Sequence, residues 1–205
     1  MKEIILIGYS GHAYVVFEIF ASQNLVVSAY TDVTEKKENP YSLKWLGNEN
    51  DAVVTKKLKD YRYFVSTGNN ALRQKISTKL IEEIGQPLNA IHPSAVISKS
   101  LQVGFGNMFA ANVVVNAQVK IGNGIICNTG SIIEHECIIG NYAHIAPGAV
   151  LCGDVQIGEG SFIGANTVVK EGVRIGKNVI IGAGAVIVKD IADDKKVIGN
   201  PQRII

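Results

Sequence analysis

An apolar residue recurs at every sixth position from Ile97 to Ile187, and this period limits the possible folds more than any other feature of the chain. The series is Ile97, Val103, Phe109, Val115, Ile121, Cys127, Ile133, Ile139, Ile145, Leu151, Ile157, Ile163, Val169, Ile175, Ile181 and Ile187. A small or branched residue, such as Ala143, Ala149 or Ser161, stands two positions earlier. An uninterrupted repeat of this kind predicts a coiled architecture in which each hexad forms one flat side and one corner, and three hexads close a coil.

Glycine marks one corner of each expected coil. It recurs every 18 residues, at Gly104, Gly122, Gly140, Gly158 and Gly176. We expect these glycines to relieve backbone strain where the chain turns, and successive coils to pair as parallel ladders. A flat β-sandwich is the alternative, but one unbroken phase along the whole segment disfavours it.

The first ninety residues alternate strand-like and helix-like segments instead. Glu3–Gly8, Leu25–Thr31 and Tyr61–Thr67 read as strands, Ala13–Ser22 and Asn70–Ile84 as helices, and Asp32–Asn50 as the least ordered stretch. This pattern predicts a small parallel, Rossmann-like α/β domain over residues 1–92, followed by the coiled domain over residues 93–205.

Composition excludes several classes of protein. Apolar residues make up 47% of the chain and charged residues 19%, which is typical of a compact domain. The formal net charge of +2 is spread along the chain, so we expect neither nucleic acid nor an anionic membrane as a partner. With no signal-peptide pattern and no membrane-spanning stretch, the chain is expected to be cytoplasmic. The three cysteines lack metal-type spacing and are expected to be reduced.

His135 is the candidate catalytic residue within the repeat. It follows the inward Ile133, so it should lie at a corner of the coil, and it stands between Glu134 and Glu136. An imidazole has an ordinary pKa of about 6.5, which leaves a neutral base available near pH 7, and an adjacent carboxylate can orient it. The alternative is a solvated polar corner with no catalytic role.

The segment 128–140, NTGSIIEHECIIG, resembles the active-site segment of the bacterial nucleotide-sugar acetyltransferases, within the hexapeptide-repeat acyltransferase superfamily. That group includes N-acetyltransferases of UDP-linked and GDP-linked 4-amino sugars and the sialic-acid O-acetyltransferases. The resemblance implies a left-handed parallel β-helix, a homotrimer with active sites between subunits, acetyl-CoA as co-substrate and no metal. It also implies that His135 is the general base and that Glu136 orients it.

The resemblance assigns acetyl-CoA contacts as well. In segment 141–149 the residue matched by His144 contacts the thioester region, and the N–H of Gly153 is expected to face the thioester carbonyl; Ala165 is grouped with these contacts. An interface histidine, hydrogen-bonded across the trimer, is the alternative for His144. Segment 197–201 resembles the closing segment that packs near CoA, although Gln202 stands where relatives often have alanine.

The turn at residues 8–12, GYSGH, follows a strand and opens a helix, where backbone N–H groups attract phosphate. It is not G-x-G-x-x-G, so no dinucleotide cofactor is expected. The resemblance implies that the nucleotide sugar is bound by Ser10, Gly11, His12, Asp32, Gly68 and Asn69. Val33 replaces an aspartate of some relatives and leaves the nucleobase open. A merely structural turn is the alternative.

These features predict an enzyme that transfers acetyl from acetyl-CoA to the amino group of a UDP- or GDP-linked 4-amino sugar by direct attack. The first alternative is O-acetylation of sialic acid, which the motifs do not separate. Two further alternatives are a trimeric metalloenzyme resembling the γ-type carbonic anhydrases and a non-catalytic binding module. Cys137, two residues from His135, is expected to face inward as a packing residue rather than act as a nucleophile.

Overall fold

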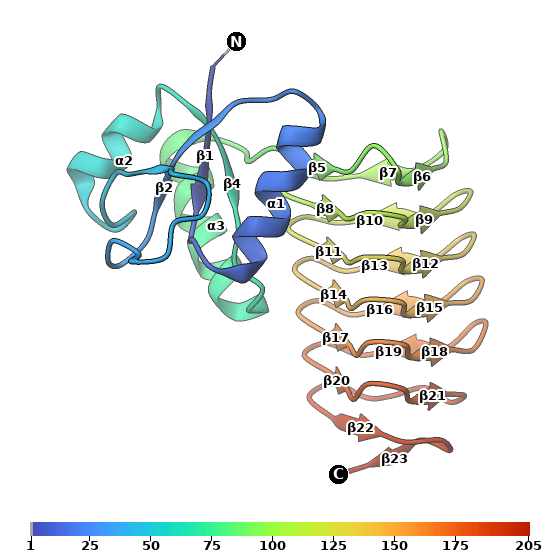
Figure 1. Ribbon diagram of the computed structural model, residues 1–205. Helices are drawn as coiled ribbons and strands as arrows, with labels where there is room; N and C mark the ends of the chain where they lie inside the picture. Colours follow the sequence, from blue (N-terminus) through green and yellow to red (C-terminus); the bar gives the residue numbers. More distant parts are fainter. Residues whose placement is uncertain (1) are drawn as a thin grey trace.

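The computed structural model describes residues 2–205 and shows an α/β unit docked beside a tall prism of short strands (Figure 1). The α/β unit has a parallel sheet of order β3-β2-β1-β4. Its elements are β1 (Ile4–Ile7), α1 (Gly11–Ser22), β2 (Val27–Thr31), β3 (Lys44–Trp45), α2 (Ala52–Leu58), β4 (Arg62–Val65) and α3 (Asn70–Ile84). This arrangement confirms the predicted fold class of the N-terminal part.

Alternate side chains of β1 pack into two different layers. Ile4 and Leu6 join α1 in a core that continues into the prism, whereas Ile5 and Ile7 pack with Leu58 of α2 and Leu80 of α3. The sheet is therefore covered on both faces, as expected for parallel strands. Helix α1 lies between the sheet and the start of the prism, where it contacts β5 (Ala90–Ile91).

The segment expected to be least ordered is folded. Residues 32–50 contain β3, and the buried Leu43 is held by Asn39, whose side chain bonds both the N–H and the carbonyl of Leu43. Tyr41 stacks on Phe17 with ring centroids 3.8 Å apart. Aromatic contacts to α1, rather than a periodic pattern, order this stretch, so a reading by periodicity missed it.

The prism is a left-handed parallel β-helix with three faces. The first face holds β7 (Gln102–Val103), β10 (Lys120–Ile121), β13 (Ile138–Ile139), β16 (Gln156–Ile157) and β19 (Arg174–Ile175). The second holds β6 (Val96–Ile97), β9 (Val114–Val115), β12 (Ile132–Ile133), β15 (Val150–Leu151), β18 (Val168–Val169) and β21 (Val186–Ile187). The third holds β5, β8 (Met108–Phe109), β11 (Ile126–Cys127), β14 (His144–Ile145), β17 (Phe162–Ile163), β20 (Ile180–Ile181), β22 (Lys196–Ile198) and β23 (Arg203–Ile204).

Each strand from β5 to β18 pairs with the strand 18 residues further along, as Ile121 does with Ile139 and Ile139 with Ile157. Near the C-terminus the step shortens to 16 residues, as in the pairing of Ile180 with Lys196. Among the described strands of the prism, β22 and β23 form the only antiparallel pair. Because β5 already pairs with β8, the prism begins at residue 90; the division into domains at residue 92 stays a prediction. No helix within residues 2–205 has the length and apolar character to cross a lipid bilayer.

The predicted inward positions are buried from Phe109 to Ile187, but the first two are not. Val103 is 42% exposed and Ile97 is only partly buried. Both belong to the first full coil, which has no complete coil stacked on its outer side. The six-residue period thus identifies the inward side chains correctly but does not show where the stack ends.

The 18-residue glycines serve a different purpose from the one expected. None of Gly104, Gly122, Gly140, Gly158 and Gly176 has a positive φ; positive φ occurs instead at other corner residues, such as Gly148 and Asn166. A Cβ on Gly158 would lie 2.4 Å from the carbonyl carbon of Gly176. These glycines permit the close approach of successive coils rather than relieve backbone strain.

Gly158→Ala should therefore lower the thermal stability of the protein. The added methyl group meets backbone that cannot move without disturbing the next coil, so we expect a loss of about 1–3 kcal/mol in the free energy of unfolding. Gly11→Ala is the matched control, because no atom lies within 4 Å of the added Cβ and the φ of Gly11 is not positive. Equal melting temperatures for the two variants, measured by circular dichroism, would contradict the close-packing explanation.

Candidate functional site

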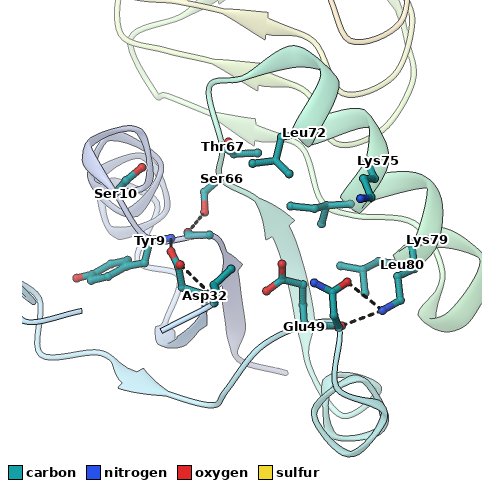
Figure 2. Close-up of a pocket in the computed structure, with 14 residues that line it drawn as sticks. Tyr9, Ser10, Asp32, Glu49, Ser66, Thr67, Leu72, Lys75, Lys79 and Leu80 are labelled. Atoms are coloured by element: carbon teal, nitrogen blue, oxygen red, sulfur yellow. Dashed lines mark hydrogen bonds between the residues drawn. The ribbon is translucent and has the colours of Figure 1, made fainter. Parts of the chain in front are cut away.

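A pocket of about 340 Å³ opens at the carboxyl ends of β1, β2 and β4 (Figure 2). Strands β2 and β4 lie on opposite sides of β1, so the connections leave this point in opposite directions, and such a switch point is the usual ligand site of an open α/β sheet. The lining residues are Gly8, Tyr9, Ser10, Asp32, Val33, Glu49, Asn50, Ser66, Thr67, Leu72, Lys75, Ile76, Lys79 and Leu80.

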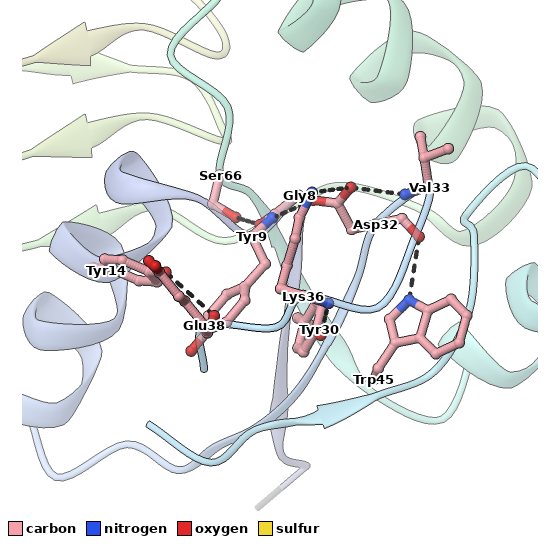
Figure 3. A network of polar contacts seen from close by, with 10 residues as sticks. All are labelled: Gly8, Tyr9, Tyr14, Tyr30, Asp32, Val33, Lys36, Glu38, Trp45 and Ser66. Carbon is pink, nitrogen blue, oxygen red and sulfur yellow. Dashed lines mark hydrogen bonds and ion pairs between the residues drawn. The ribbon is translucent and has the colours of Figure 1, made fainter. Parts of the chain in front are cut away.

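Asp32 is the most firmly held of the predicted site residues (Figure 3). Its carboxylate accepts hydrogen bonds from the N–H groups of Tyr9, at 3.0 Å, and of Val33, at 2.8 Å. Lys36 forms an ion pair with the same group at 2.9 Å. Asp32 therefore joins the turn after β1 to the turn after β2 and presents an anchored carboxylate to the pocket.

The predicted site residues in the turn at 10–12 do not all face the same pocket. Ser10 lines the pocket and stands at the N-cap of α1 without making a side-chain cap, so N–H groups of the first helical turn stay available to an anion. His12 instead turns toward Gly68, outside the pocket lining. Burial, with a smaller effect from the positive charge of Arg73, lowers the pKa of His12 to about 4. His12 is therefore neutral at physiological pH.

Gly68 and Asn69 form the loop that leads into α3. Asn69 caps the helix by accepting a hydrogen bond from the Leu72 N–H at 2.9 Å. The loop borders a second hollow, of about 510 Å³, between α3 and the third face of the prism, near Gly160 and Phe162. The structure thus places Gly68 and Asn69 beside the pocket that Ser10 and Asp32 line, rather than in it.

Arg73 is the main residue of this region that the sequence analysis missed. Its side chain is 1% exposed, and it donates to the carbonyls of Gly124 at 2.7 Å and Tyr142 at 2.9 Å in the prism. It also donates to the carbonyls of Thr67 and Gly68, at 3.1 and 3.2 Å. Burial lowers its pKa to about 10, so it remains charged at neutral pH. Arg73 therefore ties the loop before α3 to the prism.

The contacts of α3 define the docking corner of the prism, the turns that join the first face to the third, at residues 122–125, 140–143 and 158–161. Arg73 reaches the first two turns, and Asn70 donates to the Gly160 carbonyl at 2.9 Å in the last. A sequence signal for Arg73 existed, because it shares the buried side of α3 with Ser77 and Leu80 at helical spacing.

His135 lies at a different place, in the turn between β12 and β13. Its Nδ1 is 3.1 Å from a carboxylate oxygen of Glu136, and the two side chains are 53% and 65% exposed. Glu134 is engaged elsewhere, accepting a hydrogen bond from Asn116 at 2.8 Å. With its Nδ1–H held by a carboxylate, the His135 ring keeps Nε2 as a free proton acceptor.

Gly153 lies in the next coil directly beneath His135. A Cβ on Gly153 would be 2.4 Å from Cε1 of His135, so the imidazole occupies the space that a side chain would fill. These residues define the histidine corner, the turns joining the second face to the first at residues 134–137 and 152–155. Ala165 lies at the remaining corner, between β17 and β18, and is not brought to His135 within one chain.

His144 belongs to the side on which the α/β unit docks. It is 8% exposed, its Nε2 is 3.2 Å from the Asn128 amide nitrogen, and its ring packs edge-on against Phe162. Burial, with the charges of Arg73 and His12, lowers the pKa of His144 to about 3. Its Nδ1 is buried without a partner among residues 2–205. One chain therefore holds His144 near His12, apart from the histidine corner.

The cysteine beside His135 is a packing residue, as predicted. Cys137 is buried, and its thiol donates to the Cys152 carbonyl at 3.2 Å. Burial raises the pKa of this thiol to about 12, so it is protonated at neutral pH. Within the described part of the chain, no three His, Cys, Asp or Glu side chains gather in a way that could hold a metal ion.

Comparison with known proteins agrees with this architecture. Residues 3–80 match the PglD N-terminal domain family, and residues 154–189 match the bacterial transferase hexapeptide family of six repeats. The crystal structure of PerB from Caulobacter crescentus, in complex with CoA and GDP-perosamine, is 36% identical. The alignment covers 100% of this chain and 98% of PerB, with a TM-score of 0.93. The chain belongs to the hexapeptide-repeat acetyltransferases of bacterial nucleotide sugars.

Two further relatives of this acetyltransferase widen the comparison. The acetyltransferase domain of PglB from Neisseria gonorrhoeae, in complex with acetyl coenzyme A, is 31% identical over 100% of this chain and 99% of that domain, with a TM-score of 0.93. The UDP-N-acetylbacillosamine N-acetyltransferase of Bacillus subtilis is 30% identical over 113 residues, 54% of this chain. The match spans about half, 52%, of that curated relative.

Replacing the buried guanidinium should destabilise the acetyltransferase. Arg73→Met leaves several buried carbonyl oxygens without a donor, and we expect a loss of about 3 kcal/mol in the free energy of unfolding. Arg174→Met, which removes an exposed arginine from β19, is the matched control and should change little. A chemical denaturation midpoint for Arg73→Met equal to that of the control would show that Arg73 does not join the two parts.

Proposed function

We propose that this acetyltransferase moves the acetyl group of acetyl-CoA to the amino group of a nucleotide-linked 4-amino sugar, with His135 as general base. The observation that carries the proposal is the His135–Glu136 pair, 3.1 Å apart, which leaves Nε2 of an accessible imidazole free. A base in this state can take a proton from an amine as the amine attacks. CoA and GDP-perosamine in the PerB structure, and acetyl coenzyme A in the PglB domain, support the choice of substrates.

In the proposed reaction the amine nitrogen attacks the thioester carbonyl carbon while His135 takes a proton from that nitrogen. Collapse of the tetrahedral intermediate breaks the carbon–sulfur bond, and the CoA thiolate leaves and recovers a proton from the imidazolium. The carboxylate of Glu136 stabilises the imidazolium in between. The products are the N-acetylated sugar nucleotide and free CoA, with no acetylated enzyme.

The developing oxyanion needs a donor, and Gly153 is suited to supply it. No hydrogen bond from the Gly153 N–H occurs within residues 2–205, and the absent side chain leaves its backbone open beneath His135. A free backbone N–H close to the base can stabilise negative charge on the thioester oxygen. We assign His144 and Ala165 to the binding of acetyl-CoA on the same proposal.

The pocket lies in the α/β unit, which docks at one corner of the prism, whereas the proposed base lies at another corner, so a neighbouring copy must complete each active site. We propose a homotrimer, in which the histidine corner of one subunit faces the α/β unit of the next. Outward apolar side chains on the prism faces, at Ile138, Val168 and Ile180, are 38–46% exposed in the single chain and support such packing.

Release of free CoA from acetyl-CoA tests the proposal. UDP-linked and GDP-linked 4-amino sugars should be acetylated, and His135→Ala should lower kcat at least a hundredfold because base assistance is lost. His92→Ala replaces a half-buried histidine at the start of the prism whose side chain bonds only Ser94; it is the control and should retain activity. Turnover with free sialic acid alone would favour O-acetylation, and full activity of His135→Ala would rule out its role as base.

Direct transfer of the acetyl group also predicts that Cys137 is not needed for catalysis. Because its thiol is buried and protonated, Cys137→Ala should retain most of the activity in the same assay and lose a little thermal stability from the smaller side chain. Mass spectrometry of the protein mixed with acetyl-CoA should reveal no acetylated form. A loss of three orders of magnitude in kcat, with the fold intact, would require a covalent intermediate instead.

A further inference from the structure

The proposed nucleotide pocket contains a buried carboxylate oxygen that no residue of the described chain bonds. Glu49 is 6% exposed, and its Oε2 is buried without a hydrogen-bond partner among residues 2–205. Its backbone carbonyl, by contrast, is held by the Thr55 hydroxyl at 3.0 Å and by the Lys79 amine at 3.3 Å. Figure 2 shows the side chain directed into the space that Asp32 and Leu80 border. The carboxylate is thus positioned by its neighbours but not bonded by them.

A buried acceptor without a donor is costly, so its presence in a pocket indicates that a ligand supplies the donor. The contrast with Asp32 is informative. Asp32 already bonds two backbone N–H groups and Lys36, so its carboxylate has partners within the chain before any ligand binds. Glu49 lines the same pocket, but no residue within 2–205 bonds its buried carboxylate oxygen.

We propose that Glu49 binds the Watson–Crick edge of a guanine, and that the nucleotide half of the substrate is GDP. This inference rests on the proposed function, in which the pocket takes a nucleotide sugar. Guanine alone among the common bases carries two adjacent donors, N1–H and the N2 amino group, and can bond a carboxylate through both oxygens. Uracil offers one N–H between two carbonyl oxygens, which a carboxylate repels.

The rest of the pocket suits the same base. Leu72, Ile76 and Leu80 provide an apolar wall for the faces of the ring. Lys75 and Lys79 also line it and can donate to the O6 and N7 acceptors that guanine presents on its other edge. Val33 follows Asp32, so this position adds no second carboxylate that could bond the N1–H and N2 amino groups of guanine in place of Glu49.

Nucleotide binding, measured by calorimetry without any sugar, tests the inference. GDP should bind the wild-type protein at least tenfold more tightly than IDP, which lacks the N2 amino group, and more tightly than UDP. Glu49→Gln keeps the shape of the side chain but loses one acceptor, so GDP affinity should fall about tenfold to a hundredfold while UDP affinity changes little. Glu82→Gln, an exposed position on α3, is the matched control and should bind GDP as the wild type does.

The outcomes separate this inference from the function on which it rests. UDP binding as tightly as GDP, or an unchanged GDP affinity in a folded Glu49→Gln protein, would overturn the assignment of guanine and leave the acetyltransferase proposal intact. Binding of none of the three nucleotides would overturn both the guanine assignment and the nucleotide-sugar substrate. Loss of acetyl transfer in His135→Ala does not bear on nucleotide affinity, so the two tests are independent.

Discussion

The hydrogen-bonded register between coils, 18 residues per step, is the constraint on which the rest of the prism depends. It stacks inward side chains such as Ile121, Ile139 and Ile157 into one core. The same register places Gly153 beneath His135. The imidazole of His135 therefore fits only because the residue below it in the next coil has no side chain. The geometry proposed for catalysis is therefore a consequence of the repeat, and it needs no inserted loop.

A second constraint joins the prism to the α/β unit. The Arg73 guanidinium is surrounded by carbonyl oxygens and an Asn70 side-chain oxygen, with no carboxylate among its hydrogen-bond partners in the described chain. Such a cation is stabilised only while both parts stay in place, because either part alone would leave it short of acceptors. The loop at residues 67–69 is held in this way between the proposed nucleotide pocket and the prism, so the docking of the two parts also fixes the position of this loop.

The sequence predicts the repeating part of this protein much better than the part that recognises substrate. A period of six predicts which side chains point inward, because every hexad has the same surroundings. It fails only at Ile97 and Val103, where the stack ends. In the α/β unit, the short helix α2 was not predicted, whereas α1, α3, β1, β2 and β4 also follow from periodicity. Residues 32–50, Arg73 and Glu49 do not, because their places depend on contacts between distant segments: Tyr41 with Phe17, Arg73 with Tyr142, and Glu49 with Thr55 and Lys79. The positions of the corner glycines were predicted correctly, but the predicted relief of backbone strain was wrong. The repeat does not indicate how closely the backbones of successive coils approach one another.

The histidines show how one residue type can serve different tasks in a single fold. His135 stands in solvent beside a carboxylate, whereas burial keeps His144 neutral at any pH well above 3. With the Asn128 amide donating to its Nε2, His144 carries its proton on Nδ1, the nitrogen that is buried and unpartnered. A neutral donor of this kind suits an uncharged acceptor such as a thioester or acetyl oxygen, and it is poorly suited to a phosphate, for which a cation would be stronger. The electrostatics of the fold therefore support the proposed contact of His144 with the acyl end, rather than the nucleotide end, of CoA.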